Sequence, residues 1–134
     1  MAIMRKYEEF EDESGRTVRY CRGADGGLVA ADATVAQDAR IGAQAWVDPG
    51  ARVEAGASVG AHGWVERDAV VGQRARLASR VHLGPGAVVG PGARIGERVE
   101  IGAGARVAAG AVVPDDAQVP AGADVGRGSH ARAA

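Results

Sequence analysis

Hydrophobic residues recur every six positions through most of the chain. From Val29 to Val125 every sixth residue is Val, Ile or Leu, 17 in a row, and a small or short side chain stands two positions before each of them. A period of six drifts around an α-helix, which turns by about 100° per residue, but it is a multiple of the strand period of two. The small and the aliphatic residue therefore point to the same side of a strand. The remaining positions are rich in Gly, Pro, Asp and Ala, so each hexad is predicted to be a short strand followed by a bend.

Uniform bends and uniform inward residues favour a solenoid of stacked coils over antiparallel hairpins. The segments IGAQAW, VEAGAS, VGPGAR and IGAGAR share an aliphatic residue, then Gly, Ala, Asp or Glu, two free positions, a small residue and one free position. This pattern resembles the hexapeptide-repeat, left-handed parallel β-helix superfamily, which includes proteins like the trimeric UDP-N-acetylglucosamine acyltransferases. The resemblance covers residues 27–126. It implies an all-β solenoid in which three hexads form one triangular coil of 18 residues, giving five to six coils.

The two ends of the chain do not follow the count of six. Residues 1–26 contain two alternating polar and apolar runs around Ser14 and Gly15, which predict a short N-terminal β-hairpin. We expect this hairpin to cap the first coil, whose open edge would otherwise be a template for aggregation. Residues 127–134 are small and polar and are predicted to be a disordered tail.

Residues 18 apart should lie above one another in such a coil, so the sequence can be arranged into outward columns. One column holds both tryptophans of the chain, then a histidine and a glutamate, and the neighbouring corner column holds a histidine and two arginines. The resulting candidate site consists of Trp46, His62, Trp64, Arg80, His82, Arg98 and Glu100. The alternative for its polar residues is a solvated corner in which His82 pairs with Glu100. An exposed pair of indoles is typical of an interface with another protein or of a ligand surface. The alternative is that the N-terminal hairpin covers them.

A second column places Val70 above Val88, flanked by glycine and alanine. Because members of the superfamily are nearly all trimers of side-by-side prisms, the resemblance implies that these valines form the contact of a homotrimer. The alternative is that they are scattered surface valines, which are common on soluble proteins.

Composition narrows the classes of function. The 134 residues carry a formal net charge of −1, so no overall field attracts nucleic acid or a membrane surface, and neither is expected as a partner. The single cysteine, Cys21, excludes an internal disulfide. The N-terminus lacks the apolar run of a signal peptide, and the expected location is the cytoplasm.

Two functions from different classes are open. The leading interpretation is a trimeric assembly or interaction module without catalysis, since an unbroken count of six leaves no loop to shape a pocket. The alternative, implied by the resemblance, is a minimal acyltransferase that uses acetyl-CoA or acyl-CoA as co-substrate and needs no other cofactor. His82 would then be the general base at a cleft between subunits and Glu100 would orient it, while Arg80 and Arg98 would bind the CoA phosphates.

A third and more remote possibility is an enzyme like the γ-type carbonic anhydrases, which share the fold. That family needs three histidine ligands for its metal. His62 and His82 could supply two of them, but the closely spaced histidine pair of the family is missing and His130 lies in the tail. No metal site is therefore predicted.

Overall fold

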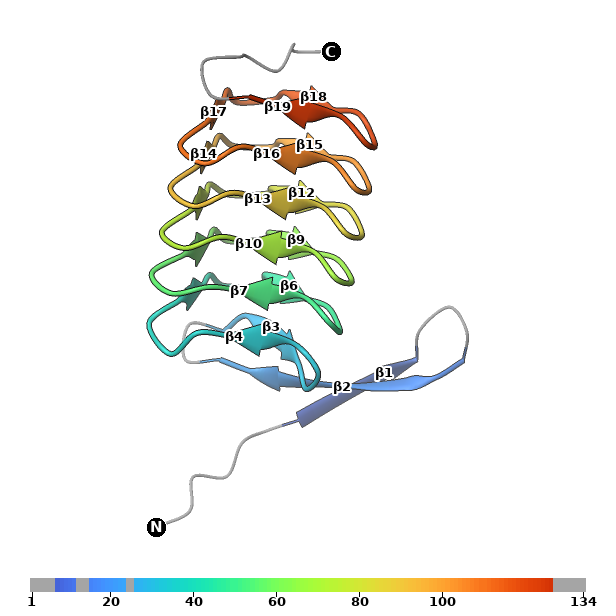
Figure 1. The fold of residues 1–134 in the computed structure, drawn as a ribbon. Coiled ribbons are helices and arrows are strands. Elements are labelled where there is room, and N and C mark those ends of the chain that lie inside the picture. Colours follow the sequence, from blue (N-terminus) through green and yellow to red (C-terminus); the bar gives the residue numbers. More distant parts are fainter. Residues whose placement is uncertain (1–6, 12–14, 24–25, 127–134) are drawn as a thin grey trace.

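The computed structural model describes residues 7–11, 15–23 and 26–126. These residues form an all-β, left-handed parallel β-helix with an N-terminal hairpin, as predicted (Figure 1). Each strand of the β-helix before the last coil pairs in parallel with the strand 18 residues later, so the three sheets run along the solenoid as three flat faces. No helix among the described residues is long and apolar enough to cross a membrane. The predicted tail at 127–134 lies outside the described residues.

The largest of the three sheets has eight strands in the order β1-β2-β3-β6-β9-β12-β15-β18. Its strands are β1 (Tyr7–Glu11), β2 (Thr17–Arg22), β3 (Leu28–Ala30), β6 (Trp46–Val47), β9 (Trp64–Val65), β12 (His82–Leu83), β15 (Glu100–Ile101) and β18 (Gln118–Val119). The hairpin thus belongs to the same sheet as the column of tryptophans.

The other two sheets contain only strands of the β-helix, six in one and five in the other. The six-stranded sheet consists of β4 (Thr34–Val35), β7 (Arg52–Val53), β10 (Val70–Val71), β13 (Val88–Val89), β16 (Arg106–Val107) and β19 (Asp124–Val125). The five-stranded sheet consists of β5 (Arg40–Ile41), β8 (Ser58–Val59), β11 (Arg76–Leu77), β14 (Arg94–Ile95) and β17 (Val112–Val113).

The interior contains the residues that the count of six predicts. The small and aliphatic positions of the middle coils are fully buried, and no polar or charged residue among those described is buried with them. At the N-terminal end Val29 and Val35 are only half-buried, because no complete coil lies beneath them to cover their side chains. Burial of these aliphatic groups is the main term that holds the coils together.

The bends turn through left-handed backbone at the fourth position of the hexad, counted from its aliphatic residue. Two of the three corners use mostly glycine there, for example Gly86 and Gly104, with φ of 70° and 68°. The corner that leads into β6, β9, β12, β15 and β18 uses no glycine in these five coils, and its left-handed residues are Gln44, His62, Arg80, Arg98 and Asp116. A residue with a Cβ pays a strain of about 1 kcal/mol or more in this conformation. Backbone hydrogen bonds between coils, such as the one from the His62 N–H to the Ala43 carbonyl at 2.9 Å, hold these residues in place.

The hairpin caps one of the three edges of the first coil. Strand β2 pairs antiparallel with both β1 and β3, with Tyr20 opposite Ala30. The other two sheets end at β4 and β5, which pair with no strand of the hairpin among the described residues. In Figure 1 the β1–β2 hairpin projects sideways from the first coil instead of lying flat across its end. This direction gives the hairpin a second role, described next.

Candidate functional site

A groove of about 850 Å³ lies between the hairpin and the outer face of the first coils, where β6 and β9 carry Trp46 and Trp64. The hairpin forms one wall, and the first coils of the β-helix form the other. The residues that line it are Phe10, Glu11, Tyr20, Gln44, Trp46, Asp48, His62, Gly63, Trp64, Glu66, Arg67 and Pro85. The expectation that an unbroken solenoid would have no pocket is therefore wrong, because a segment outside the repeats supplies the missing wall.

Three aromatic rings fix the hairpin against the solenoid. Phe10 from β1, Tyr20 from β2 and Trp46 from β6 contact one another edge to face, with ring centroids 5.1 to 5.6 Å apart. Such pairs add about 0.5–1.5 kcal/mol each beyond the burial of their area. The hairpin thus packs against Trp46, which is half-buried, but leaves Trp64 44% exposed. The alternative that the hairpin covers the tryptophans therefore holds for Trp46, while the role of Trp64 in an interface or ligand surface stays a prediction.

Asp48 links the hairpin to the exposed tryptophan. Its Oδ1 accepts a hydrogen bond from the Tyr20 hydroxyl at 2.9 Å, and its Oδ2 accepts one from the Trp64 indole Nε1–H at 2.7 Å. Asp48 itself is half-buried at the groove surface. The carboxylate therefore sets the orientation of the Trp64 ring from the hairpin side.

His82 lies on the other side of the same indole. The imidazole of His82 stacks on Trp64 with ring centroids 4.7 Å apart and planes inclined by 18°. Its Nε2 is hydrogen-bonded to Oε2 of Glu66. The side chains of His82 and Glu66 are 35% and 21% exposed, so the pair is sheltered but reachable from solvent.

The partner of His82 is Glu66 and not Glu100, the residue expected from the sequence. Glu100 does stand opposite His82 in the strand register, but its side chain is exposed, and the carboxylate that contacts the imidazole is the diagonal neighbour. Glu66 lies two residues after Trp64, the register partner of His82, on the same face of the sheet. Diagonal neighbours across a sheet are within reach of long side chains.

The two acid–ring contacts repeat one geometry in consecutive coils. Asp48 and Trp64 are 16 residues apart, and so are Glu66 and His82. We call Asp48–Trp64 and Glu66–His82 the acid–ring pairs. The two acids occupy the second position of their hexads, 18 residues apart, where the following coils of this sheet carry Gly84, Gly102 and Pro120. The column of second positions contains both acids, and this is the signal in the sequence that identifies them.

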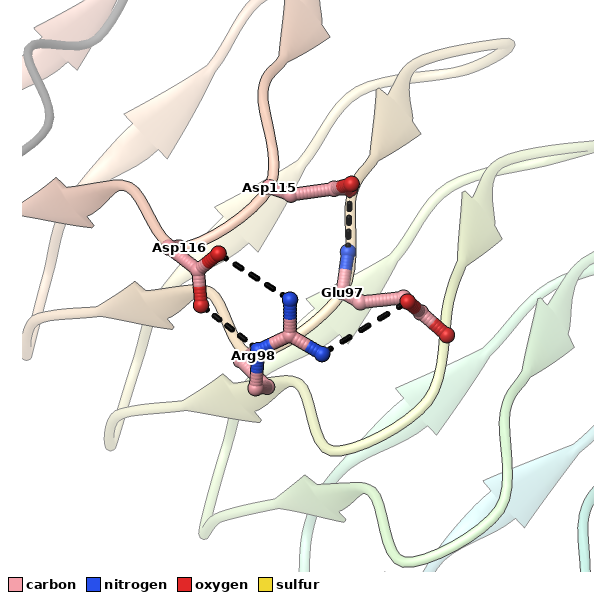
Figure 2. A network of polar contacts seen from close by, with 4 residues as sticks. All are labelled: Glu97, Arg98, Asp115 and Asp116. Carbon is pink, nitrogen blue, oxygen red and sulfur yellow. Dashed lines mark hydrogen bonds and ion pairs between the residues drawn. The ribbon is translucent and has the colours of Figure 1, made fainter.

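The arginines of the predicted site lie apart from the groove. Neither Arg80 nor Arg98 is among the residues that line it. Arg98 already forms ion pairs with two acids (Figure 2). Its Nε and Nη2 donate hydrogen bonds to Asp116 at 2.6 and 3.0 Å, and its Nη1 lies 3.6 Å from the Glu97 carboxylate. The hydrogen bond from Arg98 lowers the pKa of Asp116, and the same bond raises that of Arg98. Arg80 is exposed and forms no side-chain ion pair with any described residue.

The other predicted features occupy the places expected from the repeat. Val70 and Val88 stack in register on the outer face of the six-stranded sheet, both half-buried within one chain. Their role as a subunit contact stays a prediction. Within the described part of the chain, no three His, Cys, Asp or Glu side chains are grouped to hold a metal ion, and His130 lies outside it.

Comparisons with known proteins agree with this architecture. A family model described as bacterial transferase hexapeptide (six repeats) matches residues 80–115. A crystal structure of a histidine-to-asparagine mutant of perosamine N-acetyltransferase from Caulobacter crescentus, in complex with CoA and GDP-perosamine, is 32% identical with a TM-score of 0.73. It covers 74% of this chain and 47% of its own. PerB from Caulobacter crescentus, in complex with the same two ligands, is 27% identical with a TM-score of 0.61, and covers 79% and 51%.

A third structure is similar in fold alone. A hexapeptide transferase family protein from Anaplasma phagocytophilum is 21% identical with a TM-score of 0.53, and covers 78% of this chain and 69% of its own. A comparison with curated proteins found no match. The chain spans about half the length of the two Caulobacter structures. The resemblance to the hexapeptide-repeat superfamily is confirmed.

Proposed function

We propose that this hexapeptide-repeat β-helix protein transfers an acyl group from a CoA thioester to an amine or hydroxyl, with His82 as general base. The observation that carries the proposal is the hydrogen bond between Glu66 and His82. The imidazole of His82 stacks on the exposed Trp64, and both Trp64 and Glu66 line the groove. A sheltered carboxylate–imidazole pair next to a cavity is the arrangement that general-base catalysis requires. The CoA complexes of the two Caulobacter structures support the class of donor.

The hydrogen-bond partner of His82 defines which nitrogen can act. An ionised carboxylate only accepts hydrogen bonds, so Nε2 carries the hydrogen that faces Glu66. Trp64 makes the same kind of contact to Asp48 one coil earlier, and its indole nitrogen is always a donor. The lone pair of neutral His82 is then on Nδ1, which becomes the base. Glu66 stabilises the positive charge that the ring gains when Nδ1 takes a proton.

The proposed step conserves its atoms. Nδ1 of His82 takes the proton of the acceptor N–H or O–H as the nitrogen or oxygen attacks the thioester carbonyl carbon. The new bond to carbon forms, the carbon–sulfur bond breaks, and the proton passes to the leaving thiolate to give free CoA. Exposed Arg80 is the stronger candidate for the CoA phosphates, since Arg98 would first have to release Asp116.

The assembly that we propose is a homotrimer in contact through the strip of Val70 and Val88. Both valines are already half-buried in the single chain and stand in a row on a flat face. A non-catalytic interaction module remains the second candidate function. Its support is the exposed Trp64 surface, which would then bind a protein.

Release of free thiol from acetyl-CoA, measured over a panel of amine and hydroxyl acceptors, tests the proposal. We expect His82→Ala to lower kcat by about 10²–10⁴-fold, the usual contribution of a general base. Glu66→Gln should cause a smaller loss of kcat, because the amide keeps a contact to His82 but not the charge. Glu54→Gln is the matched control: Glu54 is the remaining acid at the second position of a hexad, on a different corner, and should leave the rate unchanged. No acceptor-dependent thiol release with any acceptor would leave the interaction module as the function.

A further inference from the structure

We propose that the groove binds an organic cation, that is, an ammonium group on an apolar body, with Asp48 as its counter-ion. This inference rests on the proposed function in one respect: the groove is taken to be the acceptor side of the acyl-transfer site. It narrows the acceptor from any amine or hydroxyl to an amine that arrives protonated.

The walls of the groove are aromatic on both sides. Phe10 and Tyr20 approach from the hairpin, and Trp46 and Trp64 from the solenoid. Phe10 and Trp64 keep 39% and 44% of their surface exposed, which makes them two of the three exposed large hydrophobic residues among those described. Aromatic faces that remain in contact with water on opposite sides of a cavity favour an apolar ligand, and their negative π-faces also attract a cation.

No described residue of opposite charge balances the carboxylate of Asp48. Both hydrogen bonds to Asp48 come from neutral donors, the Tyr20 hydroxyl and the Trp64 indole. Among the described residues no Lys, Arg or His forms an ion pair with it. Each carboxylate oxygen keeps a second lone pair that a ligand N–H can occupy. A half-buried carboxylate next to indole rings is an environment in which an ammonium ion is strongly favoured.

The remaining charged residues that line the groove also favour a positively charged ligand. Two of the lining residues are acids, Glu11 from the hairpin and Glu66, whose carboxylate contacts His82. Arg67 and His62 also line the groove, but Arg67 already has its own contacts within the protein. With three carboxylates against one arginine and one histidine, an anion such as a CoA phosphate would be repelled from the groove. The donor phosphates therefore belong outside it, toward Arg80.

This arrangement would bind the charged substrate of the proposed reaction more tightly than its neutral product. The protonated amine binds between Asp48 and the aromatic walls, and loses its extra proton to solvent. The neutral amine then attacks the thioester carbonyl carbon, while Nδ1 of His82 takes a second proton from the nitrogen and returns it to the thiolate. The product is a neutral amide, which has lost the charge that Asp48 held. Loss of that attraction would favour release of the product over the substrate.

The indole N–H resonances of the protein give a residue-specific test, because the chain contains only two tryptophans. The probes are cyclohexylammonium, cyclohexanol and cyclohexanecarboxylate, which share one ring and differ in charge. In the unmodified protein we expect cyclohexylammonium to shift the Trp64 indole signal saturably, at concentrations at least tenfold lower than cyclohexanol needs. Cyclohexanecarboxylate should leave the signal unchanged. A Trp46→Phe variant identifies which signal belongs to Trp64.

Two variants test whether the carboxylate of Asp48 is the charge that binds cyclohexylammonium. Asp48→Asn keeps an acceptor for Tyr20 or Trp64 but removes the charge, and should weaken cyclohexylammonium binding at least tenfold. Glu54→Gln should bind it like the unmodified protein. Equal shifts with all three probes, or unchanged binding by Asp48→Asn, would overturn the inference.

The outcomes separate the inference from the proposed function. If thiol is released with hydroxyl acceptors while cyclohexylammonium fails to bind, the cation site is wrong and the acyltransferase stands. If cyclohexylammonium binds but no acceptor supports thiol release, the cation site stands and the acyltransferase is wrong. The comparison of the three probes needs no substitution of Asp48, so it remains decisive even if Asp48→Asn loosens the hairpin.

Discussion

The N-terminal and C-terminal halves of the eight-stranded sheet have the same interior and different exteriors. Both halves place Val, Leu or Ile under each strand, and their coils stack in one register. Outside, the N-terminal half carries the acid–ring pairs and the hairpin, whereas the equivalent 16-residue steps in the C-terminal half join Gly84 to Glu100 and Gly102 to Gln118. The interior repeat therefore builds the scaffold, and two acids placed at otherwise small positions turn one part of it into a site.

The largest effect is expected from a charged residue at an inward, buried position of the repeat. Val89 is fully buried, and Val89→Asp would place an unpaired carboxylate in a core with no polar partner among the described residues. The cost of several kcal/mol is a large part of the roughly 5–15 kcal/mol that stabilises a domain. We expect the variant to be unfolded by circular dichroism.

Val112→Asp is the matched control for that substitution. Val112 occupies the outward position just before an aliphatic residue and is 51% exposed. Its variant should fold, with a change in the free energy of unfolding within about 0.5 kcal/mol. A folded, strand-rich Val89→Asp protein would contradict the assignment of inward positions.

A second effect separates the two tryptophans. Trp46 holds the hairpin through Phe10 and Tyr20, so Trp46→Ala should loosen the hairpin and cost about 2 kcal/mol, less than the 3–5 kcal/mol of a fully buried tryptophan. Trp64→Ala should cost less, about 1 kcal/mol, since Trp64 keeps 44% of its surface exposed. Hydrogen exchange of the β2 amides measures the difference: fast exchange is expected in the first variant and near-normal exchange in the second. Equal protection of β2 in both would show that the aromatic cluster does not anchor the hairpin.

A third, smaller effect compares the polar corner with the glycine corners. Arg80→Gly should raise the free energy of unfolding by up to about 1 kcal/mol, because glycine adopts a φ of 61° without strain. Gly104→Ala should lower it by about 1 kcal/mol; a Cβ there meets no atom within 4 Å, so only the backbone strain of φ 68° acts. Chemical denaturation measures both. Changes of the same sign would contradict the strain that we assign to the corner.

The smallest effect concerns the Arg98–Asp116 pair at the C-terminal end of that corner. Because Arg98 lowers the pKa of Asp116 in the folded protein, the pair stabilises the fold above the pKa that this carboxyl has in the unfolded chain. The contribution is lost as the pH falls through the lower, folded value. In the Asp116→Asn variant the free energy of unfolding should therefore fall slightly less steeply as the pH drops below about 4. Asp124→Asn, at an exposed position of β19, is the control, and an equal change in both variants would argue against the pair.

The sequence predicted the fold well because one physical rule is repeated without a break. Each hexad must bury the same two positions, so a single period defines the strands and the corners, and the resemblance to the superfamily adds the register of 18. The column of Trp64 and His82 followed from that register alone. The hairpin, too, could be predicted, from the alternation on either side of Gly15.

The partners within the site could not be found in the same way. Columns compare a position with itself one coil later, but Asp48–Trp64 and Glu66–His82 are diagonal contacts between different positions of the hexad. The groove depends on the direction of the hairpin, which is set by contacts of Phe10 and Tyr20 with Trp46, and these follow no period. A site built where a repeat meets a non-repeating segment escapes any argument from the repeat alone.

The most direct test of the central claim is a titration of intrinsic fluorescence with acetyl-CoA, using Trp46→Phe to observe Trp64 alone. If the face with the acid–ring pairs is the acyl-transfer site, acetyl-CoA should change the Trp64 emission saturably, and Arg80→Ala should weaken the binding. His82→Ala should retain binding, since a general base is needed for the reaction and not for the thioester. Flat emission up to millimolar acetyl-CoA would contradict the claim and identify this face as a surface for contact with another protein.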